Sequence, residues 1–143
     1  MKLTDRLPLL FVIGFFVVGG GFVVWQKFGS SGGGSAGGPI LPSLSDQAAA
    51  GKVAFEKHCA KCHGVNAIGT DSGPPLLHDY YQPGHHADMA FVSAARQGVP
   101  SHHWNFGDMP PVPDLSDREL IDIIRYVREL QIANGIVYRP HHM

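Results

Sequence analysis

The 143-residue sequence predicts an all-α domain that follows a single N-terminal transmembrane helix. Three observations lead to this fold class. Two segments of the chain, one that runs from Ser45 toward Cys59 and one that covers 116–131, begin with good helix-capping residues and carry apolar side chains suited to helices. No run of residues shows the alternation of a strand, and no βαβ pattern is present. An uncharged, largely apolar run, 7–26, lies near the N-terminus.

Residues 7–26 predict the membrane span. About twenty helical residues cover the ~30 Å hydrocarbon core of a bilayer, whereas the apolar part of a cleaved signal peptide runs for only about 7–15 residues. Trp25 suits the membrane interface. We therefore expect residues 1–28 to form an uncleaved signal anchor, with cleavage near Ser35 to Gly37 as the alternative. Lys2 and Arg6 before the span predict a cytoplasmic N-terminus and an external domain.

The next segment, 29–44, is rich in glycine, serine and proline and predicts a flexible linker that prolines stiffen at its end. The remaining residues, 45–143, form the predicted globular domain. The formal net charge of the chain is −1, which gives no reason to expect nucleic-acid binding.

Three helices are expected in the domain. The first has Ser45 as its N-cap and runs toward Cys59, with Gly51 inside it where another backbone can approach closely. A second covers 87–97 and stops at Gly98. The last covers 116–131 and opens with a capping box of Ser116 and Glu119.

Both cysteines of the chain lie in the sequence Cys59-Ala60-Lys61-Cys62-His63. The pattern C-x-x-C-H is the attachment signature of c-type haem, in which two thiols add to the vinyl groups and the histidine ligates the iron. A disulfide would close a very short loop, a thioredoxin-like pair would need a βαβ context, and zinc would need more ligands. The motif therefore predicts one haem c, bound through Cys59 and Cys62 with His63 as a ligand.

At this point the chain resembles the class I cytochromes c over about residues 45–132. The residues that carry the resemblance are Gly51-x-x-x-Phe55, Cys59 to Gly64, Gly73-Pro74-Pro75-Leu76, Met109-Pro110-Pro111 and Ile124 to Leu130. The resemblance implies a small all-α fold around one covalent haem, in which the first and last helices cross at Gly51 and Tyr126. It also implies that the Pro74 carbonyl accepts a hydrogen bond from His63.

The sixth iron ligand remains to be assigned. Met109 is the leading candidate, because it lies in a proline-rich loop that resembles the ligand loop of bacterial family members and that restricts the backbone. Met89 is expected to be an ordinary core or surface residue. Several histidines follow the motif: His78, His85, His86, His102 and His103. We expect solvated loop histidines, with two alternatives: ligation of the iron by His102 or His103, or a separate copper or zinc site.

Taken together, the sequence predicts an electron carrier and not an enzyme. The expected protein is a single-pass inner-membrane protein whose haem domain lies in the periplasm. Its expected partners are membrane oxidoreductases of the respiratory chain, such as a quinol-oxidising complex and a terminal oxidase. The alternatives are a haem sensor or peroxidase-like enzyme with a labile sixth ligand, a haem subunit of a larger oxidoreductase complex, and a metal-handling protein.

Overall fold

The computed structural model describes residues 38–140. The predicted span 7–26 and most of the predicted linker lie outside the described residues. Within the described part of the chain, none of the helices is both long and apolar enough to cross a membrane.

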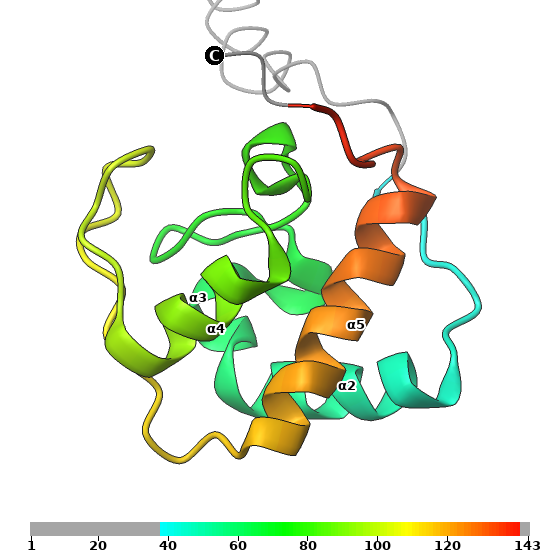
Figure 1. Ribbon diagram of the computed structural model, residues 1–143, viewed down its shortest axis with the longest axis horizontal. Helices are drawn as coiled ribbons and strands as arrows, with labels where there is room; N and C mark the ends of the chain where they lie inside the picture. Colours follow the sequence, from blue (N-terminus) through cyan, green and yellow to red (C-terminus); the bar gives the residue numbers. More distant parts are fainter. Residues whose placement is uncertain (1–37, 141–143) are drawn as a thin grey trace, which may run out of the picture. The chain divides into compact units, whose positions relative to one another are not determined.

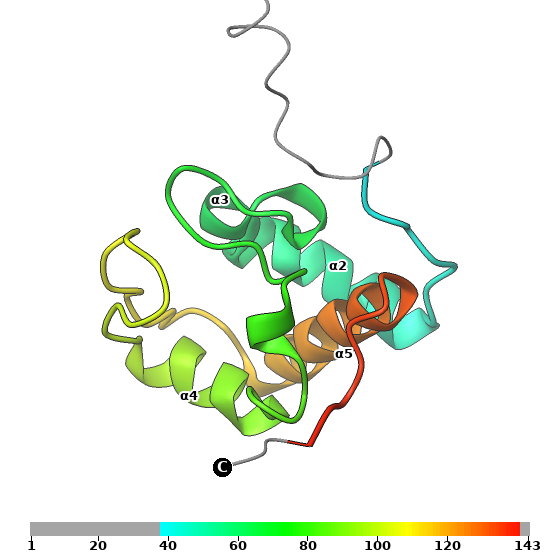
Figure 2. The ribbon, with the colours of Figure 1, turned by 90° about the horizontal axis from the view of Figure 1, so that it is seen from above.

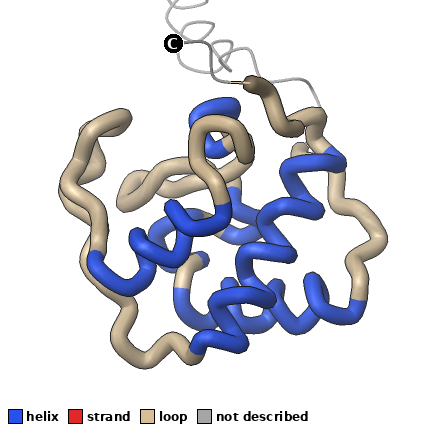
Figure 3. The backbone as a smooth tube through the Cα atoms, viewed as in Figure 1, coloured by secondary structure: helices blue, strands red, loops and turns tan. Residues whose placement is uncertain are grey.

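The described elements are helices and loops (Figure 3). In chain order they are α2 (Asp46–His58), α3 (Ala60–His63), η2 (Val65–Ala67), η3 (Asp79–Tyr81), α4 (Asp88–Gln97) and α5 (Asp117–Ala133). Apart from two isolated bridges, residues 38–140 form no β-structure. The prediction of a helical domain is confirmed.

Helix boundaries agree with the caps expected from the sequence. The Ser45 hydroxyl accepts a hydrogen bond from the Ala48 amide at the start of α2. At the start of α5, Ser116 and Glu119 form both halves of the capping box. These bonds are the main reason that the pKa of Glu119 falls from its ordinary value of 4.5 to about 2. Gly98 ends α4 with a positive φ of 76°.

Helices α2 and α5 cross, and this crossing organises the core (Figures 1 and 2). Gly51 lies directly against the backbone of α5, where a Cβ atom on residue 51 would overlap the carbonyl oxygen of Asp122. One turn further along α2, the fully buried rings of Phe55 and Tyr126 pack with centroids 5.5 Å apart. The contact of α5 with the glycine is therefore made by the Asp122 backbone, and Tyr126 contacts Phe55.

Residues before α2 also belong to the folded unit. Ile40 exchanges two hydrogen bonds with the Asn134 side chain, each 2.9 Å long, and Leu44 packs against the core. Asn134 is at the same time the C-cap of α5. The end of the predicted linker is thus attached to the C-terminal end of α5.

Two polar side chains of α5 form hydrogen bonds with the backbone of the loop segment 76–86. Gln131 is completely buried and donates to the carbonyl oxygens of Leu76 and Tyr81 at 2.9 and 3.1 Å. Arg128 donates to the carbonyls of Tyr81 and His86 at 2.8 and 2.5 Å. Buried polar groups are stabilising when they are paired in this way, so α5 holds the segment 76–86 in place.

Candidate haem site

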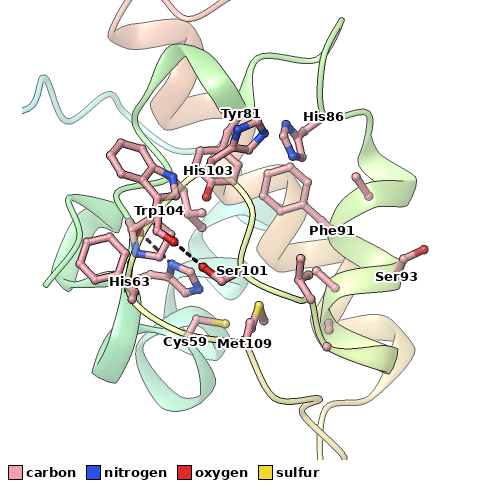
Figure 4. A pocket seen from close by; sticks show the side chains of 18 of the residues that line it. Cys59, His63, Tyr81, His86, Phe91, Ser93, Ser101, His103, Trp104 and Met109 are labelled. Carbon is pink, nitrogen blue, oxygen red and sulfur yellow. Dashed lines mark hydrogen bonds between the residues drawn. The ribbon is translucent and has the colours of Figure 1, made fainter. Parts of the chain in front are cut away.

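A cavity of about 430 Å³ with a mostly apolar lining opens beside the C-x-x-C-H motif. Its walls come from α3, α4, the 74–86 segment and the loop 99–109 (Figure 4). The lining includes Cys59, His63, Pro74, Phe91, Trp104 and Met109. A concave apolar site with a few polar groups is typical of a ligand or cofactor site.

His63 is held by the chain that follows it. Its Nδ1 atom donates to the Pro74 carbonyl oxygen at 2.9 Å, the hydrogen bond that the family resemblance implied. Burial lowers the pKa of His63, and the bond to Pro74 raises it in part. The ring is therefore neutral near pH 7, with its proton on Nδ1 and the lone pair of Nε2 available to a metal.

The two cysteines differ in their surroundings. Cys59 is partly buried beside the cavity, and Cys62 is exposed. Burial, assisted by the neighbouring Cys62, raises the pKa of the Cys59 thiol to about 11. Reactive cysteines and thiolate zinc ligands have lowered pKa values. The raised pKa of the Cys59 thiol is the opposite of the lowered pKa that a reactive thioredoxin-like cysteine shows.

Met109 lines the same cavity as Cys59 and His63, and its backbone is fixed on both sides. It exchanges two hydrogen bonds, each 2.9 Å long, with Val99 across the base of the loop 99–109. Beyond the prolines, the Val112 amide donates to the Ala95 carbonyl of α4 at 2.8 Å. The segment 109–112, which contains two prolines, is therefore anchored at both ends, as a rigid ligand loop requires.

Gly98 serves this arrangement in a way that the sequence analysis missed. A Cβ atom at this position would lie 2.5 Å from the Met109 carbonyl oxygen and 3.2 Å from a carbon of Pro111. Gly98 thus ends α4 and, because it has no Cβ atom, also lets the backbone of Met109 lie close to it. The only sequence signal for this second role was the glycine itself.

The other methionine of this region lies elsewhere. Met89 is 67% exposed on α4 and does not line the cavity, as expected for a surface residue. Among the histidines, His78 caps η3, since its Nδ1 atom accepts from the Tyr80 amide. His85, His86 and His103 come together in space, although the sequence analysis preferred separate solvated loop residues.

The cavity fits a haem group in one respect that does not depend on the motif. The indole nitrogen of Trp104 is buried and meets no acceptor with hydrogen-bond geometry, although Tyr81 lies near it. A buried donor without a partner is costly. A haem propionate would supply the missing acceptor, so the residues present suit a porphyrin that carries carboxylates.

Comparison with known proteins agrees with this site. Residues 48–131 match the family model described as cytochrome c. The match covers more than half of the sequence, and the chain belongs to the cytochrome c family. It is therefore a haem protein of electron transfer that binds one haem c covalently through Cys59 and Cys62.

One solved structure is similar to the chain: cytochrome CL from the marine methylotrophic bacterium Methylophaga aminisulfidivorans MPT. The identity is 23% and the TM-score 0.48, over 82% of this chain and 87% of that chain. No curated protein matches this chain significantly.

Proposed function

We propose that this protein is a membrane-tethered monohaem electron carrier in which His63 and Met109 would ligate the iron. One observation carries the proposal: Met109, on a loop fixed at both ends, lines the same cavity as His63 and Cys59. The haem supplies a reversible one-electron change at its iron.

The residues around the haem would keep its attachment and the positions of its ligands nearly unchanged while the iron gains or loses an electron. Cys59 and Cys62 attach the group, and the Pro74 carbonyl orients the His63 ring. Val99 and the prolines after Met109 restrict the backbone of Met109, which favours a ligand loop that moves little. Phe91 and Trp104 contribute large apolar side chains to the wall of the cavity. Burial and a thioether ligand both favour a raised reduction potential.

The contacts of the competing histidines support Met109 as the ligand. The ring of His103 stacks on Tyr80 with centroids 4.6 Å apart, and its Nε2 atom faces His85. His102 is exposed, which disfavours it as a ligand of a buried iron; its Nδ1 atom donates to the Pro100 carbonyl at 2.9 Å. In Figure 4, His103 lies near Tyr81 and His86, while Met109 lies near Cys59 and His63.

Carbon monoxide distinguishes a closed carrier from a sensor or a peroxidase-like enzyme. We expect the reduced protein at neutral pH to show no spectral change with carbon monoxide, because the thioether occupies the sixth position. Met109→Ala is the control, and it should form the adduct readily. Rapid, stoichiometric adduct formation by the unmodified protein would contradict the carrier proposal.

We further propose that residues 7–26 anchor the chain in the inner membrane, with the haem domain in the periplasm. The length and lack of charge of this run support the anchor. From Ser45 onward the chain has eight basic and eleven acidic side chains, a net charge of −3 before the propionates. Long-range electrostatic steering is then weak for partners that need a basic surface. A short flexible tether instead gives effective concentrations of about millimolar.

Membrane oxidoreductases, such as a quinol-oxidising complex and a terminal oxidase, are the proposed partners. A variant that begins at Pro39 behind a cleavable export signal keeps the contacts of Ile40 and tests the tether. It should retain the spectrum and the potential of the full chain. Electron flow in membranes should fall sharply at native abundance and recover when the soluble domain is added in excess. Equal activity at equal low abundance would show that the anchor has no role in the encounter.

A further inference from the structure

Three histidines from two separate segments meet beside the haem cavity. His85 and His86 follow η3, and His103 lies in the loop 99–109. Each offers a ring nitrogen, and the three nitrogens all lie within 4.8 Å of one another. His86 and His103 also line the cavity. We propose that His85, His86 and His103 form a three-imidazole site for a divalent transition-metal ion, zinc or copper.

The spacing of the first pair suits a shared metal ion. The Nε2 atoms of His85 and His103 are 3.4 Å apart. Two nitrogens bound at the usual ~2.0–2.1 Å to one tetrahedral zinc ion lie about 3.3–3.4 Å apart. The two rings therefore already have the separation that they would keep on either side of a metal.

The third ring is oriented as metal-ligating histidines usually are. Nδ1 of His86 donates to the Tyr80 carbonyl oxygen at 2.5 Å, which fixes the proton on Nδ1 and leaves Nε2 as the ligand atom. The backbone of His86 is held as well, since its carbonyl accepts from Arg128 at 2.5 Å. Arg128 in turn pairs with Asp88 at 2.8 Å. His86 is therefore held in place by a hydrogen bond that connects it to Arg128 of α5.

The donor set decides the class of metal. Three imidazoles without a carboxylate do not suit calcium or magnesium, which require oxygen ligands. Imidazole suits zinc and copper, and copper binds such sites more tightly. The remaining coordination position is open to water, because the cluster contains three ligand atoms and His85 is exposed.

A metal at this site would connect two walls of the cavity. The segment 79–86 is fixed to α5, whereas the loop 99–109 is closed at its base by the pairing of Val99 and Met109. His103 lies near the far end of that loop from this base. Metal binding should therefore restrain the outer part of the loop and raise the unfolding temperature.

Zinc and copper titrations of the full-length, haem-loaded protein test the site, after a chelator has removed any metal other than the haem iron. Calorimetry should show one saturable zinc site, and zinc should raise the thermal midpoint. His85→Gln, His86→Gln and His103→Gln should each weaken zinc binding about tenfold or more, and His85→Gln, whose residue does not line the cavity, should leave the haem spectrum unchanged. The paramagnetic resonance spectrum of bound copper should show splitting from several nitrogens, and His103→Gln should reduce it.

Two matched controls make the assignment specific. His102→Gln changes the neighbouring histidine, and a His141→Gln/His142→Gln double variant removes the histidine pair at the C-terminus. Both should bind zinc within about threefold of the unmodified protein. The proposal is overturned if zinc does not saturate a site, if His103→Gln binds it as well as the unmodified protein does, or if either control variant abolishes binding.

Discussion

Met109→Ala should remove the iron–thioether absorption band of the oxidised protein completely and lower the reduction potential. The physical reason is the loss of a soft axial ligand that favours the reduced iron, and axial ligands set haem potentials over a range of about 0.8 V. The backbone of residue 109 should remain in place, because its bonds to Val99 do not involve the side chain. Optical spectra and a potentiometric titration measure the two effects.

Met89→Ala is the matched control for this result. Met89 is on the exposed face of α4 and outside the cavity, so the band and the potential should be nearly unchanged. A histidine ligand would give a different pattern. If the unmodified protein lacks the thioether band, or if His103→Gln rather than Met109→Ala changes the iron spectrum, the assignment of Met109 is wrong.

Gly51→Leu should lower the free energy of unfolding by about 1–3 kcal/mol or more, the range typical of overpacked cores. The added Cβ alone overlaps the Asp122 carbonyl, and its nearest neighbours are all α5 backbone. Backbone atoms of a packed helix cannot move aside as a side chain can. The two helices must therefore separate, and Phe55 and Tyr126 lose part of their contact. Denaturant titration, followed by the haem spectrum and by circular dichroism, measures the change.

Gly51→Ala provides a sharper test, because the sign of its effect on stability depends on how closely α5 approaches residue 51. Inside an exposed helix, alanine stabilises by roughly 0.5–1 kcal/mol relative to glycine. Here the same change should destabilise the protein, because the methyl group has no space. Ala50→Leu, one residue earlier on the exposed face of α2, should leave the midpoint nearly unchanged. A gain in stability from Gly51→Ala would show that α2 and α5 do not approach as closely as described.

The features that were predictable from the sequence depend on short-range chemistry. Ser45 and Ser116 cap helices through bonds to residues three positions away, and Gly98 stops a helix by its own conformation. His63 and Pro74 are only eleven residues apart, and the family resemblance implied the hydrogen bond between them. Such contacts depend little on how the rest of the chain folds, which is why the helices and the covalent motif could be identified in advance.

The features that were not predictable depend on tertiary contacts between distant segments. Gln131 and Arg128 look like surface residues of an amphipathic helix, yet they hold the wall 76–86 from the inside. Ile40 belongs to a segment with the composition of a linker, and only its bonds to Asn134 reveal that it is attached. His103 meets His85 across a separation of eighteen positions that includes all of α4, and no local pattern encodes such a contact.

The central claim is that the iron keeps the same two axial ligands, His63 and Met109, while it gains and loses one electron. A spectroelectrochemical titration of the full-length protein at neutral pH tests this claim most directly. We expect one reversible one-electron transition, with the thioether band present throughout the oxidised state and low-spin, six-coordinate spectra in both states. A high-spin or five-coordinate spectrum in either state, or hysteresis between the reductive and oxidative titrations, would show that a ligand is exchanged and would contradict the account.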